Sequence, residues 1–302
     1  MSETVAVVVV TYNRADLLGR TLDGLAAQTH RPDAVVVVDN ASTDHTREVL
    51  DRHVSSAALP LQRLHLETNT GGAGGFRAGV EAAYTQGYDR IWLMDDDVVP
   101  APDCLAVLMG EDEACVMSVR EDAHGHLAEK AATDFDLTRP WSVRPKRASV
   151  QTAYGERSAM PERVELHNIA FEGFLVRREV VEAVGLPDES FFIFYDDVDF
   201  ALRVRRAGYT IWAVRDAVLV RQLDFDQKNA LDTWKGYYMY RNLFAVHLRY
   251  GENALVRLKP WLVTVAVVLL SPLRGGRAEA RNVIRAMRDA REMRAVPSRS
   301  VD

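Results

Sequence analysis

The chain has 302 residues, of which 48% are hydrophobic and 26% are charged, and its formal net charge is −6. This size and composition suit one large globular domain or a domain with an appendage. The charge is spread unevenly: residues 251–302 hold ten Lys or Arg against five Asp or Glu, a balance of +5, which leaves −11 on residues 1–250. The uniform basicity of a nucleic-acid-binding protein is absent, so we exclude that class of partner.

The compartment follows from the cysteines and the N-terminal residues. Two cysteines, Cys104 and Cys115, are too few for a disulfide framework or a zinc site and fit a reducing compartment. The apolar segment 5–10 is too short for the core of a secretory signal and lacks a basic leader. We therefore expect a cytoplasmic protein.

Apolar strand-like segments alternate with helix-like segments along the first third of the chain. The expected strands cover 5–10, 34–38, 61–66 and 90–94, and the expected helices cover 15–27, 44–52 and 75–86. This alternation is typical of an α/β protein with a parallel sheet. By contrast, residues 120–165 show little periodicity, and we expect irregular loops there that form a mobile lid.

Three adjacent aspartates, Asp95, Asp96 and Asp97, follow the apolar segment 91–94. Adjacent like charges repel, so such a cluster is tolerated where a hard cation or a row of hydrogen-bond donors neutralises it, and carboxylates suit Mg²⁺ or Mn²⁺. Ligands of open α/β sheets bind beyond the carboxyl ends of the strands. We interpret the triplet as a binding site; the alternative is a solvated acidic turn.

The first two expected strands also end in polar residues. Thr11, Asn13 and Arg14 follow the first strand, and Asp39 ends the second. Because an acid directly after four valines needs a partner, we expect Asp39 to contact a ligand. One edge of the sheet should collect all of these side chains with the triplet.

Four glycines lie within residues 69–77, before an expected helix. Backbone amides, a helix N-terminus and Arg77 would together favour a phosphate group there. The pattern is neither the Walker motif nor the dinucleotide fingerprint, and a flexible loop is the alternative interpretation.

A second acidic cluster, Asp196, Asp197 and Asp199, opens another expected helix. The aromatic segment 191–195 before it would desolvate the acids, and desolvation with mutual repulsion raises a carboxyl pKa towards that of a working base. The alternative is an ordinary helix start, since acids are favoured in the first turn and Asp199 is spaced for an exposed pair with Arg203.

Four motifs in this order resemble the inverting glycosyltransferases of family 2, which have the nucleotide-sugar-binding GT-A fold. The motifs lie at 8–14, 38–44, 95–97 and 195–200. The resemblance covers roughly residues 5–220. Residues 69–76 together with 92–97 resemble bacterial galactofuranosyltransferases, especially the initiating actinobacterial type, and rhamnosyltransferases are similar.

The resemblance implies an α/β GT-A domain over 1–222, with a mostly parallel mixed sheet flanked by helices, and a C-terminal helical extension over 223–302. It also implies metal-dependent, inverting transfer of galactofuranose from UDP-galactofuranose to a hydroxyl of a polyprenyl-linked glycan, in cell-wall or surface polysaccharide synthesis. Transfer of rhamnose from dTDP-rhamnose is the alternative.

By the same resemblance, ten residues would bind the nucleotide-sugar donor: Thr11, Asn13, Arg14, Asp39, Asn69, Gly72, Arg77, Asp95, Asp96 and Arg221. Asp39 would contact the uracil edge, and Asn69, Gly72 and Arg77 would border the diphosphate or the sugar.

The catalytic assignments also follow from the resemblance. Asp97 would be the direct ligand of Mg²⁺ or Mn²⁺, with Asp96 close to the ribose or the metal. Asp197 would be the base that removes the proton of the acceptor hydroxyl, and Asp196 would position hydroxyl groups.

One position departs from the family pattern. Many relatives have a histidine metal ligand after the last strand of the sheet, where this chain has Arg221. An arginine cannot ligate a cation, although it can neutralise a diphosphate. Either another group such as His247 completes the metal shell, or metal dependence is weaker; His247 is otherwise expected to be a surface residue of a helix.

The basic C-terminal region allows two interpretations. Its apolar stretch, 261–270, has about ten residues, whereas a spanning helix needs about 20, so it can lie on a bilayer without crossing it. Seven arginines between 274 and 294 favour an anionic membrane surface, which would make the protein peripheral on the inner face of the plasma membrane. The alternative is a core helix packed on the catalytic domain.

Two rival functions remain open from the sequence. Asp95 and Asp97 after an apolar strand also fit the nucleophile motif of haloacid-dehalogenase-type phosphatases, although that motif normally follows the first strand of the sheet rather than the fourth. A degenerate transferase fold that only binds or scaffolds is the non-enzymatic alternative, and the intact Asp97 and Asp197 argue against it.

Overall fold

The computed structural model describes residues 3–142, 144–223, 233–274, 277–293 and 295. Nine strands form the main sheet, in the order β3-β2-β1-β4-β10-β6-β11-β5, and β9 pairs with β11. Their bounds are β1 Val5–Thr11, β2 Ala34–Asp39, β3 Leu61–His65, β4 Arg90–Asp95, β5 Val98–Pro100, β6 Cys115–Glu121, β9 Arg163–Leu166, β10 Phe174–Arg177 and β11 Ile211–Arg221. β7 (Ala132–Phe135) and β8 (Lys146–Ser149) form a separate two-stranded sheet.

The sheet is mixed and mostly parallel in its first half, as expected. β3, β2, β1 and β4 run parallel, and β10 lies antiparallel between β4 and β6. The helices are α1 Ala15–Ala26, α2 Thr46–Ser56, α3 Gly71–Thr85, α4 Cys104–Met109, α5 Val150–Tyr154, α6 Arg178–Val184, α7 Asp196–Arg206, α8 Trp234–Tyr250, α9 Ala254–Arg274 and α10 Arg277–Glu292. Two short 3₁₀ turns, η1 Arg157–Ala159 and η2 Glu189–Phe191, complete the described elements.

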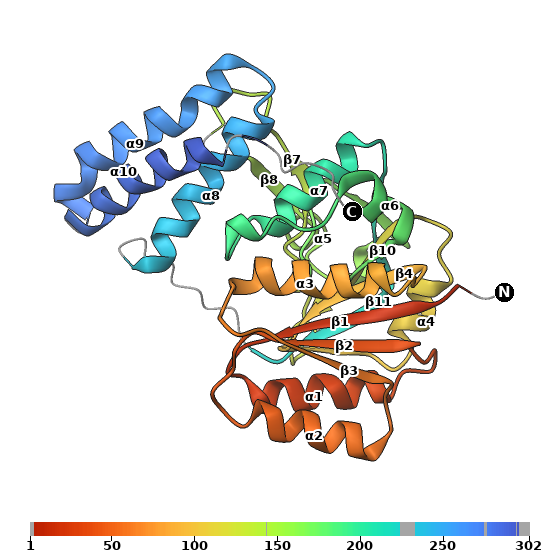
Figure 1. Ribbon diagram of the computed structural model, residues 1–302. Helices are drawn as coiled ribbons and strands as arrows, with labels where there is room; N and C mark the ends of the chain where they lie inside the picture. Colours follow the sequence, from red (N-terminus) through yellow and green to blue (C-terminus); the bar gives the residue numbers. More distant parts are fainter. Residues whose placement is uncertain (1–2, 143, 224–232, 275–276, 294, 296–302) are drawn as a thin grey trace.

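Helices cover both faces of the sheet, α1 and α2 on one side and α3 on the other (Figure 1). Strand β1 shows why, because successive side chains of a strand point to opposite faces. Val7 and Val9 belong to the hydrophobic cluster that contains Leu18 of α1, whereas Val8 and Val10 belong to the cluster of α3. All four valines are buried, which accounts for the uninterrupted apolar run.

Two expectations about the first half were wrong. Helix α3 begins at Gly71 rather than at residue 75, so the glycines lie inside the helix and not in a loop before it. The region 120–165 is only partly irregular, since β7, β8, α5, η1 and the start of β9 lie within it. These strands have only four residues each, too few for alternation to be recognised in the sequence.

Helices α8, α9 and α10 pack together beside the sheet and form a third hydrophobic cluster (Figure 1). This cluster also contains Phe191, Val198 and Leu202, which precede or belong to α7. The expected boundary at residue 222 stays a prediction, and the segment 224–232 just after it lies outside the described residues.

Candidate active site

The carboxyl ends of β1, β2 and β4 lie side by side and carry the predicted polar residues. Thr11 pairs with Asp39 across β1 and β2, and Val10 pairs with Asp95 across β1 and β4. Asp96 and Asp97 form the turn between β4 and β5. The structure therefore brings the first three motifs to one edge of the sheet.

Asp96 and Asp97 are held by partners from the end of β1. The Thr11 hydroxyl donates to Asp96 Oδ2 at 2.7 Å. Arg14 Nη1 lies 3.2 Å from Asp96 Oδ1 and 3.1 Å from Asp97 Oδ2, although 46% of its side chain is exposed. Arg14 is thus already positioned against the triplet, where a diphosphate would also reach it.

Arg221 reaches the same place from the last strand of the sheet. β5 and β11 pair so that Arg221 lies opposite Val98, the residue after Asp97, and the Gln222 amide donates to the Asp97 carbonyl at 2.8 Å. Arg221 is buried, and its Nε lies 3.7 Å from Glu172 Oε2. The position of the expected histidine is therefore occupied by a buried cation beside the triplet.

A buried ionic cluster of Arg120, Glu129, Glu172 and Arg221 lies beside the aspartate triplet, and the sequence did not indicate it. Glu172 Oε2 lies 2.7 Å from Arg120 Nη1, and Arg120 makes a two-pronged pair with Glu129 at 2.9 and 2.7 Å. Burial alone would raise the pKa of Glu172, but Arg120 and Arg221 lower it below its ordinary value. Glu172 therefore stays charged, and its negative charge acts on Asp95, Asp97 and Asp197.

The triplet carries raised pKa values. Burial, followed by the negative charges of Glu172 and Asp97, raises the pKa of Asp95 well above its ordinary value. Burial also raises the pKa of Asp96, to about 6, against the opposing effects of Arg14 and Thr11. The pKa of Asp97 is raised by burial and by Glu172. So many carboxyl groups close together favour a bound cation or protons.

Asp196 and Asp197 begin α7 and belong to the same electrostatic environment. Burial raises the pKa of Asp197 to about 6, while the Val198 amide, Arg120 and Lys146 lower it and Glu172 raises it. Burial and the charge of Asp197 raise the pKa of Asp196 well above its ordinary value. The charge of Glu172 raises the pKa of both Asp97 and Asp197, so the two acidic clusters are linked through the same buried carboxylate.

The segment before α7 is strained. Phe192, Phe194 and Tyr195 have φ angles of 61°, 68° and 66°, in the left-handed region that aromatic residues rarely adopt. The backbone amide of Ala73 on α3 donates to the Phe192 carbonyl at 3.2 Å, and Asn242 Nδ2, fully buried on α8, donates to the carbonyl oxygens of residues 191, 193 and 194 at 2.9, 2.7 and 2.8 Å. The neighbouring Arg241 donates to the carbonyls of residues 190 and 191. The C-terminal region thus fixes the backbone that presents Asp196 and Asp197.

Asp199 anchors α7 to α8 rather than lying on the surface. It pairs with Arg203 at 3.0 Å as its spacing indicated, but this pair is buried. Arg249 lies 2.7 Å from Asp199, and the Tyr250 hydroxyl donates to Asp199 at 2.7 Å. The expectation of an exposed pair was wrong because α8 covers that side of α7.

Two of the expected nucleotide contacts make bonds within the protein. Asn13 Oδ1 accepts from the Thr43 amide at 2.7 Å, and Asp39 accepts from the Ser42 amide at 2.9 Å and lies 3.0 Å from His65 Nδ1. The Asn13 bond ties the loops after β1 and β2 to each other, and Asp39 closes the loop after β2 and contacts the end of β3. Asn13 and Asp39 shape this edge of the sheet, and their nucleotide contacts stay predictions.

The glycine segment is built for close packing. Asn69 Oδ1 accepts from the Gly71 amide at 2.8 Å. A Cβ on Gly71, where φ is +72°, would lie 2.0 Å from the Phe192 carbonyl oxygen, and a Cβ on Gly75 would lie 2.5 Å from Val10. A Cβ on Gly72 would meet nothing within 4 Å. Gly72 is therefore the glycine beside which a ligand has room.

Arg77 points towards a different partner from the one expected. Its Nε lies 3.8 Å from Glu189 Oε1, on η2. Helix α3 is turned so that its glycines pack on β1, which places Arg77 towards η2. Its contact with the diphosphate stays a prediction.

The residues present suit a divalent cation in part. In the described part of the chain, Asp97 Oδ1 is buried without a hydrogen-bond partner, as expected for a carboxylate oxygen that coordinates a cation. The same residues contain no group of three acidic, histidine or cysteine side chains arranged around a metal site. Asp97, with Asp96 beside it, would have to share the ion with ligands from the donor.

His247 does not complete a metal shell in the described structure. It is buried on α8, its Nδ1 lies 2.8 Å from the Leu243 carbonyl oxygen, and burial and Lys259 lower its pKa. The expectation of a surface residue was wrong, because α9 packs over this side of α8.

The arrangement of the sheet and the site defines a class. A mixed, mostly parallel sheet with an aspartate turn after its fourth strand is the GT-A glycosyltransferase fold. A mannosyltransferase from Pyrobaculum calidifontis, solved with GDP-Man and Mn²⁺, shares it with a TM-score of 0.59 at 19% identity, over 96% of this chain and 87% of that one.

The chain belongs to glycosyl transferase family 2, whose model matches residues 6–185. Galactofuranosyltransferase GlfT1 of Mycobacterium tuberculosis is 31% identical over 259 residues, which are 80% of this chain and 81% of that protein. The N-acetylglucosaminyl-diphospho-decaprenol L-rhamnosyltransferase of the same organism is 25% identical over 246 residues, 69% of this chain and 73% of that protein. Membership of the family sets aside the phosphatase alternative.

Proposed function

We propose that the protein is an inverting glycosyltransferase that moves galactofuranose from UDP-galactofuranose to a hydroxyl group of a polyprenyl-linked glycan, in cell-wall or surface polysaccharide synthesis. The observation that carries the proposal is that the charge of one buried carboxylate, Glu172, acts on both Asp97 and Asp197, which are distant in sequence, while Glu172 itself pairs with Arg120 and Arg221. One cluster lies at the end of a strand, where ligands bind in such sheets. The other cluster begins a helix and contains Asp197, whose carboxyl pKa is raised. The similarity to galactofuranosyltransferases supports the choice of sugar.

Asp197 is the proposed base. A carboxyl group with a pKa of about 6 is largely ionised at neutral pH, yet it binds a proton far more strongly than an exposed aspartate. It would take the proton of the acceptor hydroxyl as that oxygen attacks the anomeric carbon. Attack from the side opposite the departing diphosphate inverts the anomeric configuration. Asp196 would position hydroxyl groups beside it.

Arg14 and Arg221 would balance the charge of the diphosphate. Arg14 is half exposed and contacts both Asp96 and Asp97, so a diphosphate bound at the triplet lies within its reach. Arg221 is buried on the other side of the turn and lowers the pKa of Asp97. Arg221 belongs to β11 and Arg14 lies at the start of α1, so both cations are carried by regular elements and would act without rearrangement.

Asp97, with Asp96, would hold Mg²⁺ or Mn²⁺ through the unpartnered Asp97 Oδ1. When bound, the ion supplies positive charge to the leaving diphosphate. Two cationic side chains and three aspartates at one turn make a site in which the metal adds to, rather than replaces, the neutralisation by Arg14.

Transfer of rhamnose from dTDP-rhamnose is the second candidate, because a rhamnosyltransferase is similar over 69% of this chain. The two candidates differ in the sugar and in the nucleoside. The test is a donor panel of UDP-galactofuranose, dTDP-rhamnose, UDP-galactose and UDP-glucose. Thermal shift gives binding, since a ligand of the native state raises the melting temperature by mass action.

Transfer to a lipid-linked glycan acceptor, with the product's anomeric configuration read by NMR, gives the reaction. We expect UDP-galactofuranose alone to raise the melting temperature markedly and to be transferred with inversion. A dTDP-rhamnose preference would select the second candidate. Binding of a donor without transfer or hydrolysis in the presence of Mg²⁺ or Mn²⁺ would indicate a degenerate binding module.

A further inference from the structure

Helix α9 carries an exposed apolar surface. Among the described residues, 254–271 are long and apolar enough to cross a membrane by length and composition, and only 33% of this stretch is buried. The expectation of an apolar stretch of about ten residues was therefore too short. Five large apolar side chains, each between 45% and 71% exposed, recur every three or four residues and form one stripe, the outer face of α9: Leu255, Leu258, Leu262, Val265 and Leu269.

The other side of α9 is packed and its start is tied to the catalytic domain. Val256 and Val267 are buried in the cluster shared with α8 and α10. Lys259 Nζ donates to the carbonyl oxygens of residues 139 and 142 at 2.6 and 2.9 Å, and Asn253 Nδ2 donates to that of residue 138 at 2.5 Å. A membrane-crossing α9 would have to give up these contacts, so the packed state fits a helix that lies along a surface.

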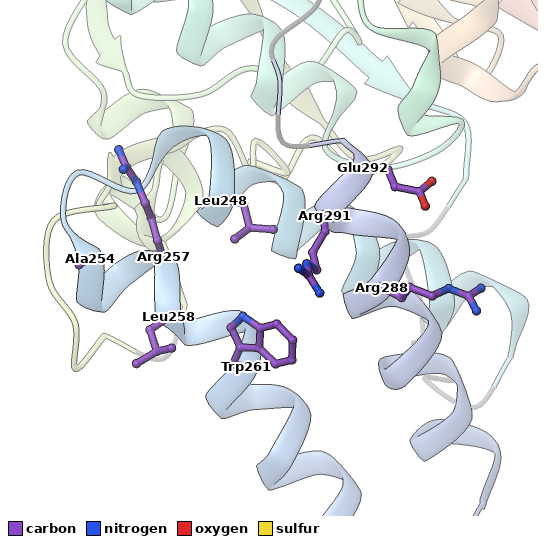
Figure 2. A pocket seen from close by; sticks show the side chains of 8 residues that line it. All are labelled: Leu248, Ala254, Arg257, Leu258, Trp261, Arg288, Arg291 and Glu292. Carbon is purple, nitrogen blue, oxygen red and sulfur yellow. The ribbon is translucent and has the colours of Figure 1, made fainter.

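A cavity of about 760 Å³ adjoins this face, between α8, α9 and α10. Figure 2 shows Trp261 at its centre, with the Arg291 side chain pointing towards the indole and Arg257 on the opposite wall. The Arg291 guanidinium lies 5.6 Å from the indole centroid. In the described part of the chain neither Arg257 nor Arg291 has an ion-pair partner, whereas Arg288 pairs with Asp289 at 3.0 Å. Arg257 also donates to the Gly251 carbonyl oxygen at 2.8 Å, and Glu292 is the acidic residue that lines the cavity beside Arg257, Arg288 and Arg291. The cavity therefore carries an excess of positive charge next to apolar side chains.

We propose that the outer face of α9 and this arginine cavity together form a docking site for an anionic phospholipid bilayer. The apolar stripe would enter the acyl boundary, and Arg257 and Arg291 would take lipid phosphate groups, with Trp261 at the level of the headgroups. The charge of the molecule agrees, since residues 251–302 carry +5 and the remainder −11. An anionic surface attracts the first region and repels the second, which sets the orientation.

A second copy of the chain is the less suitable occupant of this face. Symmetric pairing of α9 with itself would bring the same arginines of both copies towards one another. A lipid surface instead supplies negative charge to a cavity lined by three arginines and the acid Glu292. The purpose of the docking site rests on the proposed function, because a bilayer would present a lipid-linked acceptor near α8, which holds the backbone before Asp196.

The test is flotation of the full-length protein with phosphatidylcholine vesicles and with vesicles that also contain phosphatidylglycerol, without donor or acceptor. Arg257→Gln with Arg291→Gln should weaken binding to anionic vesicles by about thirtyfold, as expected for two cations near such a surface, and leave neutral vesicles unaffected. Arg47→Gln with Arg52→Gln, on exposed positions of α2, makes the same change in charge and should have little effect. Leu262→Gln with Leu269→Gln should weaken binding to both kinds of vesicle.

Circular dichroism melting would confirm that each variant is folded. The proposal is wrong if the wild-type protein floats with neither vesicle at low salt, or if the Arg257 and Arg291 variant binds anionic vesicles as tightly as wild type. Loss of a dimer, rather than of lipid binding, in the Leu262 and Leu269 variant would also overturn it in favour of a second copy. Vesicle binding by a protein that transfers no sugar would refute the proposed function and leave this proposal intact.

Discussion

The two acidic clusters of the site are built in opposite ways. Asp96 and Asp97 follow a strand, and their partners are Thr11, at the end of the neighbouring parallel strand, and Arg14, three residues further on at the start of α1. Asp197 follows a backbone segment with three strained residues, and that segment is held by α8, more than forty residues further along the chain. The first cluster is thus fixed by the sheet itself, and the second by a helix that is not part of the sheet.

Because of this difference, the two clusters should respond differently to substitutions elsewhere in the molecule. A sheet edge tolerates changes elsewhere, because each strand is held along its whole length by backbone hydrogen bonds. A strained turn persists only while its surroundings over-determine it. We therefore expect the base to depend on the C-terminal helices and the metal site to be independent of them.

The largest expected effect concerns the base. Asp197→Asn keeps the shape of the side chain and removes its ability to accept a proton, so kcat should fall by about 100- to 10,000-fold. Donor affinity, measured by calorimetry, should stay close to that of wild type. Retention of more than about a tenth of wild-type turnover would show that another group is the base.

The next effect tests the dependence on α8. Asn242→Asp replaces a donor by a carboxylate that faces three carbonyl oxygens, so the segment 191–194 should move and kcat should fall by about 100-fold, a loss typical of misplaced catalytic groups. The KM for the donor should change much less. Asn253→Asp makes the same chemical change at the start of α9 and is the control.

Melting temperatures of both variants distinguish misplacement from unfolding. A folded Asn242→Asp variant with wild-type kcat would show that the base does not depend on this helix. A shift of its pH profile, absent from the Asn253→Asp control, would confirm that the surroundings of Asp197 have changed.

Asp97→Ala tests the first cluster. It removes the oxygen that lacks a protein partner, so donor affinity in Mg²⁺ or Mn²⁺ should fall at least about tenfold, a loss seen even when a group that merely supports a metal ligand is removed. A chelator should give the same result with wild type. Equal affinity of wild type with and without chelator, by calorimetry, would assign the diphosphate to Arg14 and Arg221 alone.

The pH dependence of kcat and that of the KM for the donor should distinguish the two clusters. Asp197 is the proposed base and must be ionised, so kcat should fall by about tenfold for each pH unit below about 6 and be constant above it. Asp96 has a similar raised pKa, but it belongs to the donor side, and its protonation should appear in the KM for the donor. A kcat that stays constant from pH 7 to pH 5 would contradict the assignment of Asp197.

The smallest expected effect concerns α3, which packs on the sheet. A Cβ on Gly79 would lie 2.2 Å from Val8 Cγ1, so Gly79→Ala should destabilise the fold by about 1–3 kcal/mol. Gly72→Ala is the matched control, because its Cβ meets nothing within 4 Å. Denaturant unfolding measures both. Equal stability of the two variants would show that the glycines are not required for packing.

Much of the first cluster could be predicted from the sequence. The valines of β1 and β2 show which segments are buried strands, and parallel strands bring their carboxyl ends to one edge. Thr11, Arg14 and Asp97 therefore came together as expected. The prediction that the glycines of residues 71–75 precede the helix was wrong, because a helix that packs tightly on a strand uses the same residue type as a phosphate-binding loop.

The buried ionic cluster around Glu172 and the role of Asn242 could not be predicted from the sequence. Glu172 follows no recognisable motif, and its importance arises from burial beside Arg120 and Arg221, which are fifty residues away on either side. Asn242 is an isolated amide within a helix, and only its position near three carbonyl groups makes it important. Such contacts depend on tertiary packing, and a local pattern carries no sign of them.

The position of β10 has a consequence for synthesis. This strand (Phe174–Arg177) lies between β4 and β6 in the sheet although it follows both in the chain. A nascent chain that has just left the ribosome with β1 to β6 therefore has the aspartate triplet, but the edges of β4 and β6 that β10 later covers are open, and such edges can pair with other chains. This exposed period ends when β10 inserts, and the segment before Asp196 gains its bonds to Asn242 only after α8 emerges. Assembly from distant pairings is slow, so conditions that lengthen this interval should reduce the yield of soluble enzyme.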